Sequence, residues 1–185
     1  MSAEMEVNPA RTRVLVACVG NIFFGDDGFG VEVARRLAGC ALPKGVRVVD
    51  FGIRGVELAY SLLDGCDTLV LVDAVPRGGA PGTLYVIEVT EQRSDGSAGP
   101  ESGAGMVDAH SMDPMKVLAF AWRLGARPGR VLIVGCEPAT SARAEEYDDI
   151  QVGLSEPVQA SVNEAVRMVQ RVVAEALRVS TPTTA

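Results

Sequence analysis

Residues 13–30 read RVLVACVGNIFFGDDGFG, a sequence that predicts a strand, a glycine-rich turn and the start of a helix. Residues 13–19 are almost entirely apolar and rich in valine, which is typical of a strand buried on both faces of a sheet. From Phe29 to Ala38 the apolar residues recur at helical spacing, at Val31, Ala34 and Leu37.

The rest of the chain continues this alternation of apolar strands and amphipathic helices. Further strands are predicted at 46–49, 68–72, 82–89 and 130–134, with 82–89 at or near the sheet edge. Further helices are predicted at 56–63, with Val56 and Leu63 on the buried side, at 113–124, with Leu124 in the buried stripe, and at 155–178. The pattern indicates an α/β fold, a three-layer sandwich in which a twisted, mostly parallel sheet has helices on both faces. In such sheets ligands bind beyond the carboxyl ends of the strands, so site residues are sought there.

A length of 185 residues favours a single domain over the whole chain, 1–185. Within it we expect flexible ends at 1–12 and 179–185. Residues 94–105 contain only small, polar and glycine residues, which predicts a flexible surface loop rather than a linker between domains.

The composition excludes several classes of function. Lys and Arg number 17 against 24 Asp and Glu, and a net charge of −7 argues against a nucleic-acid partner. No apolar run is long enough to span a membrane, and the polar first dozen residues do not resemble a signal peptide. The four cysteines form no C-x-x-C pair, so we expect reduced thiols in a cytoplasmic protein, with Cys18 and Cys136 in the core.

The turn after the first strand favours a cation over a phosphate. Gly20 and Gly25 have the spacing of a phosphate-binding P-loop, but Asp26 and Asp27 stand where that loop needs Lys and Ser or Thr. Carboxylate oxygens are ligands for cations. The alternative interpretation is that both aspartates only cap the helix that follows.

Two further residues extend the candidate site. Asp73 directly follows an apolar strand, where a carboxylate is costly unless it is paired or ligated. His110 is the single histidine of the chain and lies just before the helix predicted from Asp113. Two carboxylates and one imidazole suit nickel, zinc or manganese, and three ligands leave positions open as in a transient or catalytic site.

Other chemistries lack necessary parts. The chain has no H-E-x-x-H zinc helix and no G-x-S-x-G nucleophile elbow. A phosphoacceptor receiver domain, which binds magnesium through similar acids, would need a lysine after its last strand. Glu137 and Pro138 occupy that region here, which disfavours this alternative.

The segment from Gly20-Asn21 to Gly25-Asp-Asp-Gly-Phe-Gly30 resembles the start of the nickel-iron hydrogenase maturation proteases. The resemblance extends over residues 13–173, with further matching motifs at 50–55, 72–74, 81–83, 109–114 and 153–157. It implies a twisted sheet of about five strands and a cytoplasmic endopeptidase that removes the C-terminal extension of a hydrogenase large-subunit precursor. We expect the enzyme to act as a monomer.

The resemblance also implies roles for individual residues. Asp27, Asp73 and His110 match the family's catalytic and metal-recognising trio, while Asp26 would be the helix cap. Nickel would arrive inside the precursor and be ligated transiently. Either metal-activated water or an aspartate base could cleave the peptide bond. A non-enzymatic nickel-binding maturation factor remains the alternative.

Two positions depart from the family pattern. Phe23 stands where a smaller aliphatic residue is usual, and we expect this change to alter packing only. The loop at 94–105 is longer than usual and would affect which precursor is accepted.

Overall fold

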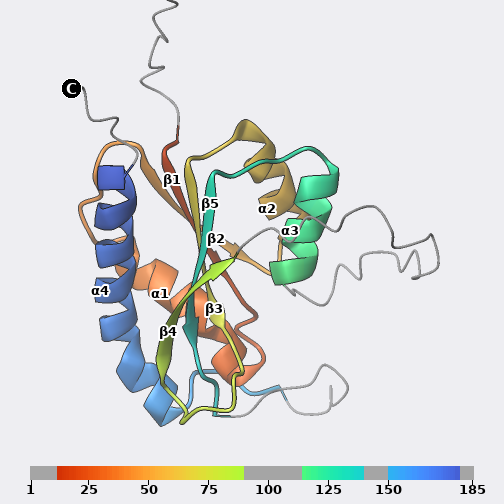
Figure 1. Cartoon of the computed structure of the whole chain (residues 1–185). Helices are drawn as coiled ribbons and strands as arrows, with labels where there is room; N and C mark the ends of the chain where they lie inside the picture. Colours follow the sequence, from red (N-terminus) through yellow and green to blue (C-terminus); the bar gives the residue numbers. More distant parts are fainter. Residues whose placement is uncertain (1–11, 90–113, 140–149, 180–185) are drawn as a thin grey trace, which may run out of the picture.

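The computed structural model describes residues 12–89, 114–139 and 150–179, which form a sheet between two pairs of helices (Figure 1). The strands are β1 (Val14–Val19), β2 (Val46–Gly52), β3 (Thr68–Ala74), β4 (Leu84–Val89) and β5 (Arg130–Cys136). The α-helices are α1 (Phe29–Leu37), α2 (Gly55–Ser61), α3 (Pro114–Arg123) and α4 (Glu156–Val179), and two 3₁₀ turns are η1 (Gly25–Gly28) and η2 (Leu62–Asp64). No helix of this described part is long and apolar enough to cross a membrane.

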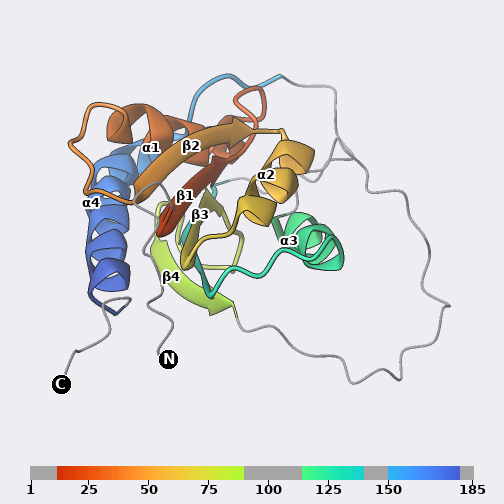
Figure 2. The same cartoon turned by 90° about the horizontal axis from the view of Figure 1, so that it is seen from above.

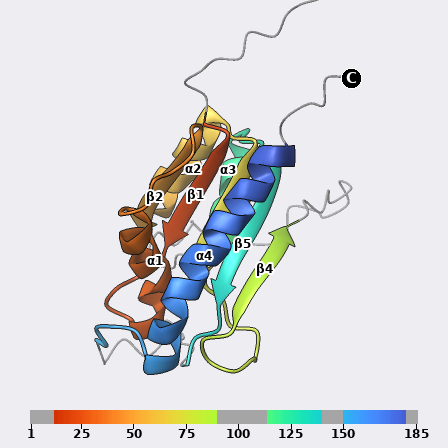
Figure 3. The same cartoon turned by 90° about the vertical axis from the view of Figure 1, so that its left-hand side faces the viewer.

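The sheet confirms the predicted mostly parallel architecture. Its strand order is β2-β1-β3-β5-β4, and only β4, at one edge, runs antiparallel to its neighbour. Every residue of the interior strand β1 is buried, because helices cover both of its faces. The parallel strands therefore direct their carboxyl ends to one edge of the sheet, and this edge is at the lower end of Figure 3.

Two hydrophobic cores lie on opposite faces of the sheet. Alternate residues of β1 divide between them: Val14, Val16 and Cys18 face α1 and α4, while Leu15, Ala17 and Val19 face α2 and α3 (Figure 2). Cys18 and Cys136 are fully buried, as expected for small core residues. Burial raises the pKa of the Cys18 thiol, and the nearby Asp50 charge adds to this effect, so the thiol is protonated.

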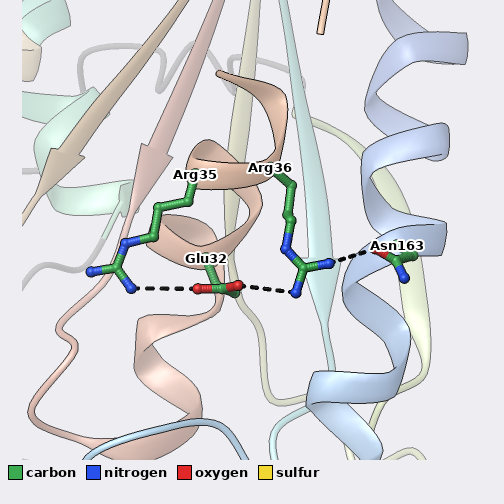
Figure 4. A network of polar contacts seen from close by, with 4 residues as sticks. All are labelled: Glu32, Arg35, Arg36 and Asn163. Carbon is green, nitrogen blue, oxygen red and sulfur yellow. Dashed lines mark hydrogen bonds and ion pairs between the residues drawn. The ribbon is translucent and has the colours of Figure 1, made fainter. Parts of the chain in front are cut away.

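Helices α1 and α4 lie side by side over one face of the sheet (Figure 3). On their solvent side Arg36 donates to Asn163 Oδ1 at 2.7 Å, and Glu32 pairs with both Arg35 and Arg36 (Figure 4). These groups are partly exposed, so they contribute little stability compared with the valine stripe of α4 beneath them.

The predicted helix faces are wrong at three positions. Val56, Leu63 and Leu124 were expected in buried stripes but are 45%, 44% and 41% exposed. Helix α2 has only seven residues before it tightens into η2, so its buried side is formed by Leu58 and Ala59, with Leu62 of η2. Leu124 lies one residue beyond the end of α3.

Strands β2 and β3 are longer than predicted, and Asp73 is consequently the penultimate residue of β3 rather than the first residue after it. The predicted flexible loop at 94–105 lies outside the described residues. The same holds for nearly all of the two predicted flexible ends.

Gly30 is where α1 approaches the sheet most closely. A Cβ atom at Gly30 would overlap the main-chain carbonyl oxygens of Val19 and Val72, at the ends of β1 and β3. The first turn of α1 is therefore held directly against the two central strands, which fixes the preceding turn η1 at the carboxyl edge.

Gly30→Ala is expected to lower the free energy of unfolding by about 1–3 kcal/mol, because backbone atoms cannot move aside as a side chain could. Gly39→Ala is the matched control, since the nearest atom to its added Cβ would be Arg36 O at 3.7 Å. Urea unfolding measures both variants. Equal stabilities for the two would contradict the close approach of α1.

Candidate active site at the carboxyl edge of the sheet

The turn between β1 and α1 carries the adjacent acids Asp26 and Asp27, and both belong to η1. This turn packs against β3, whose carboxyl end carries Asp73. The structure therefore brings Asp27 and Asp73 to the same edge of the sheet, as the sequence predicted for residues that follow parallel strands.

Asp27 is half-buried, and its carboxylate links the end of the turn to its beginning at Asn21. Its Oδ2 accepts the Asn21 N–H at 2.7 Å, and its carbonyl oxygen lies where a Cβ of Gly20 would stand. Gly20 has φ +140°, which a residue with a side chain rarely adopts. Burial raises the pKa of the Asp27 carboxyl, although the Asn21 hydrogen bond opposes this effect.

Asp26 has a different environment from its neighbour and is only 3% exposed. Its Oδ2 accepts the Ala139 N–H at 2.8 Å and the Ser155 hydroxyl at 2.9 Å, while its Oδ1 accepts the Ser155 N–H at 2.7 Å. Ser155 precedes the first residue of α4, so the carboxylate stabilises the N-terminus of that helix.

The expectation that Asp26 caps the helix after it, α1, is therefore wrong. Neither η1 nor α1 has a side-chain cap. The carboxylate instead joins three segments far apart in sequence: η1, the residues after β5 and the start of α4. Local spacing cannot reveal such a contact, because its donors lie 113 and 129 residues away.

Asp73 is 6% exposed, and its Oδ1 accepts the Ala74 N–H at 2.8 Å. A carboxylate this deeply placed needs hydrogen bonds or a cation to offset its lost hydration. Asp27 and Asp73 together offer carboxylate oxygens at one edge of the sheet, suited to accept a proton or to ligate a metal ion.

His110, the third residue of the predicted trio, lies outside the described residues. Within the described ranges, no three His, Cys, Asp or Glu side chains are grouped so that they could hold a metal ion. The described part of the site is thus the pair of aspartates.

Glu137 is a buried carboxylate at this edge that the motif analysis did not select. It is 4% exposed and accepts the N–H groups of Arg77 and Gly78 at 2.9 and 3.0 Å and the Tyr85 hydroxyl at 2.8 Å. Burial tends to raise the pKa of Glu137, but these hydrogen bonds outweigh it and lower the pKa. An acid just after the apolar strand β5 is the same signal that identified Asp73.

Phe23 is 53% exposed, so its side chain is not part of the core, and the expectation that the change alters packing only stays a prediction. Its N–H donates to Asn21 Oδ1 at 3.0 Å, so the Phe23 backbone belongs to the same turn as Asp27, which accepts the Asn21 N–H. The segment that precedes α4 contacts this turn, because the Gln151 N–H donates to the Phe23 carbonyl at 3.1 Å.

Asp26→Asn is expected to lower the free energy of unfolding by about 2 kcal/mol. The new amide NH₂ would face either the Ala139 or the Ser155 backbone N–H, whichever way it turned, and leave a buried donor unpaired. Urea unfolding at pH 7 measures the loss.

Asp27→Asn is expected to leave the free energy of unfolding at pH 7 unchanged or slightly higher. The raised pKa means that the folded state binds the Asp27 proton more tightly than the unfolded state does. The resulting stability is fully present below the ordinary carboxyl pKa of about 3.9 and is lost as the pH rises through the raised value. A loss equal to that of Asp26→Asn would contradict the different environments of the two acids.

Comparison with known proteins gives the same family from sequence and from structure. The family model described as hydrogenase maturation protease matches residues 31–172. The hydrogenase expression/formation protein HupM of Azotobacter chroococcum is 34% identical, over 92% of this chain and 76% of that protein.

Among solved structures, the hydrogenase maturating endopeptidase HybD from Escherichia coli superposes with a TM-score of 0.66 at 26% identity, covering 89% of this chain and 93% of that one. A hydrogenase 2 maturation peptidase from a Thaumarchaeota archaeon has a TM-score of 0.62 at 30% identity, covering 87% and 97%. The family model, the relatives and the solved structures agree: this chain belongs to the hydrogenase maturation protease family of endopeptidases.

Proposed function

We propose that this protein removes the C-terminal extension of a nickel-iron hydrogenase large-subunit precursor after nickel has been inserted. The observation that carries the proposal is the placement of Asp27, with its raised pKa, at the same sheet edge as Asp73 in a chain of this family. A carboxyl whose pKa is raised by burial and that sits on a turn, outside the core stripes, is typical of a functional site.

In this proposal nickel is part of the substrate. Asp27 and Asp73 contribute oxygen ligands and His110 a nitrogen ligand, a mixed set that suits a late divalent transition metal. Three protein ligands leave coordination positions for the groups of the precursor that already hold the ion. The trio thereby recognises a loaded precursor and brings its peptide bond to the sheet edge.

Cleavage requires a water molecule to add to the scissile carbonyl carbon and a proton to reach the departing amine. The Asp27 carboxyl is suited to the proton-transfer part, because its raised pKa brings it closer to the working pH than an ordinary aspartate. Polarisation of the carbonyl by the substrate's nickel is the other contribution that this proposal allows.

The receiver-domain alternative does not fit the fold. Receiver sheets of the 2-1-3-4-5 type are wholly parallel, whereas β4 here is antiparallel to β5. The remaining alternative, a nickel carrier that cuts nothing, is distinguished by product analysis.

The decisive experiment mixes the protein with nickel-loaded and nickel-free precursor and measures the mass of the large subunit. We expect loss of the C-terminal extension from the loaded precursor alone. Nickel transfer without a change in mass would establish a carrier, and equal cleavage of both precursors would contradict recognition of the metal.

Asp27→Asn, Asp73→Asn and His110→Ala are each expected to reduce cleavage of the loaded precursor by at least about a hundredfold, since each removes a ligand or a proton acceptor. Asp64→Asn is the matched control, because Asp64 is an exposed acid in η2, away from this edge. Circular dichroism and urea unfolding confirm that each variant folds. Full activity of any trio variant would remove that residue from the site.

A further inference from the structure

Beside the aspartate pair lies a second polar group, formed by Arg77, Tyr85 and Glu137. It joins the loop after β3, the edge strand β4 and the residue after β5. The proposed cleavage assigns no task to these residues. Their arrangement nevertheless has the features of a built binding position: an exposed cation with a buried carboxylate behind it.

The group lies in the same row of the sheet as Asp73. Asp73 pairs with Gly135 of β5, and Gly135 pairs with Tyr85 of β4, so the three residues are in register across three strands. Neighbouring strands are about 4.8 Å apart, which places the Asp73 and Tyr85 backbones about 10 Å from each other. Gly135 has no side chain, and the Val75 side chain lies close to where a Cβ of residue 135 would be.

Arg77 is exposed, yet both its backbone and its guanidinium have a contact. Its backbone N–H donates to the Glu137 carboxylate at 2.9 Å, and its guanidinium lies 5.6 Å from the centre of the Tyr85 ring. The Tyr85 hydroxyl donates to the same carboxylate, so one buried acid orients both the loop and the ring under the cation. A cation held in this way loses less conformational entropy when it binds an anion.

Arg77 is an exposed residue. In the described ranges no ion pair joins it to a carboxylate, whereas Arg54, at the end of β2, is paired with Glu57 at 2.9 Å. The buried acids Asp26 and Asp73 disfavour negative groups elsewhere along this edge. A carboxylate of an approaching polypeptide is therefore attracted to Arg77, which lies over Tyr85, on the second strand from the one that carries Asp73.

We propose that Arg77 binds a carboxylate carried by the C-terminal extension of the precursor, and that Glu137 is a positioning residue that acts through Arg77. The inference rests on the proposed function. A polypeptide cut near its end carries a terminal carboxylate on the leaving side, and a guanidinium binds such a group through two parallel hydrogen bonds.

The first test compares Arg77→Gln with wild type on nickel-loaded precursor. We expect KM to rise about tenfold and kcat to stay within about twofold, because the contact is remote from the scissile bond. Arg123→Gln is the control, since Arg123 is an exposed arginine in the last turn of α3, near the amino end of β5. An unchanged KM for Arg77→Gln overturns the inference, and absence of cleavage by wild type overturns the proposed function instead.

A double-mutant cycle tests the role of Glu137. Glu137→Gln is expected to raise KM about threefold in wild type and not at all in the Arg77→Gln background, because the carboxylate acts only through the cation. A residue that merely supported the fold would impair both backgrounds equally, chiefly in kcat or thermal stability. That result would remove the positioning role.

Two altered precursors identify the source of the carboxylate. One has its C-terminus amidated, and the other has the acidic side chains of the extension replaced by amides. The altered precursor that raises KM for wild type but not for Arg77→Gln carries the bound group. If neither alteration changes KM, the inference fails.

Discussion

The buried carboxylate of Asp26 is the contact on which the geometry of the carboxyl edge depends. Its two oxygens receive three hydrogen bonds, from the residues after β5 and from the start of α4. Three segments, namely η1, the residues after β5 and the residue before α4, are thereby held around one carboxylate. Turn η1 is held by the hydrogen bonds of Asp26 and by the close approach of Gly30 to β1 and β3. The adjacent residue, Asp27, therefore has a defined position.

Two neighbouring residues of the same type thus have opposite physical roles. Asp26 exchanges its hydration for three hydrogen bonds and stabilises the fold. Asp27 is half-buried and accepts the Asn21 N–H, and its raised pKa indicates that the fold does not favour its charge. A group that the fold tolerates rather than stabilises is available for a proton or a cation, and for this reason Asp27, not Asp26, is the functional candidate.

The sequence predicts most of the fold, because its signals are local. Valine-rich runs identify the five strands, and their position beside glycine turns places Asp27 and Asp73 at one edge. The errors occur where tertiary contacts decide. Val56 and Leu63 depend on the phase of a short helix that tightens into a 3₁₀ turn, and the partners of Asp26 and Glu137 depend on segments more than fifty residues away.

Phe23 illustrates the same limit from the opposite direction. An aromatic residue between apolar neighbours indicates packing in the sequence, yet the turn is closed by backbone and Asn21 contacts that need no side chain at this position. Phe23 consequently stays more than half exposed. Glu137 is the reverse case, a polar residue that the fold buries and whose carboxylate accepts the Arg77 N–H and the Tyr85 hydroxyl. At this edge the buried carboxylates fix the geometry, whereas Phe23 and Arg77 remain exposed.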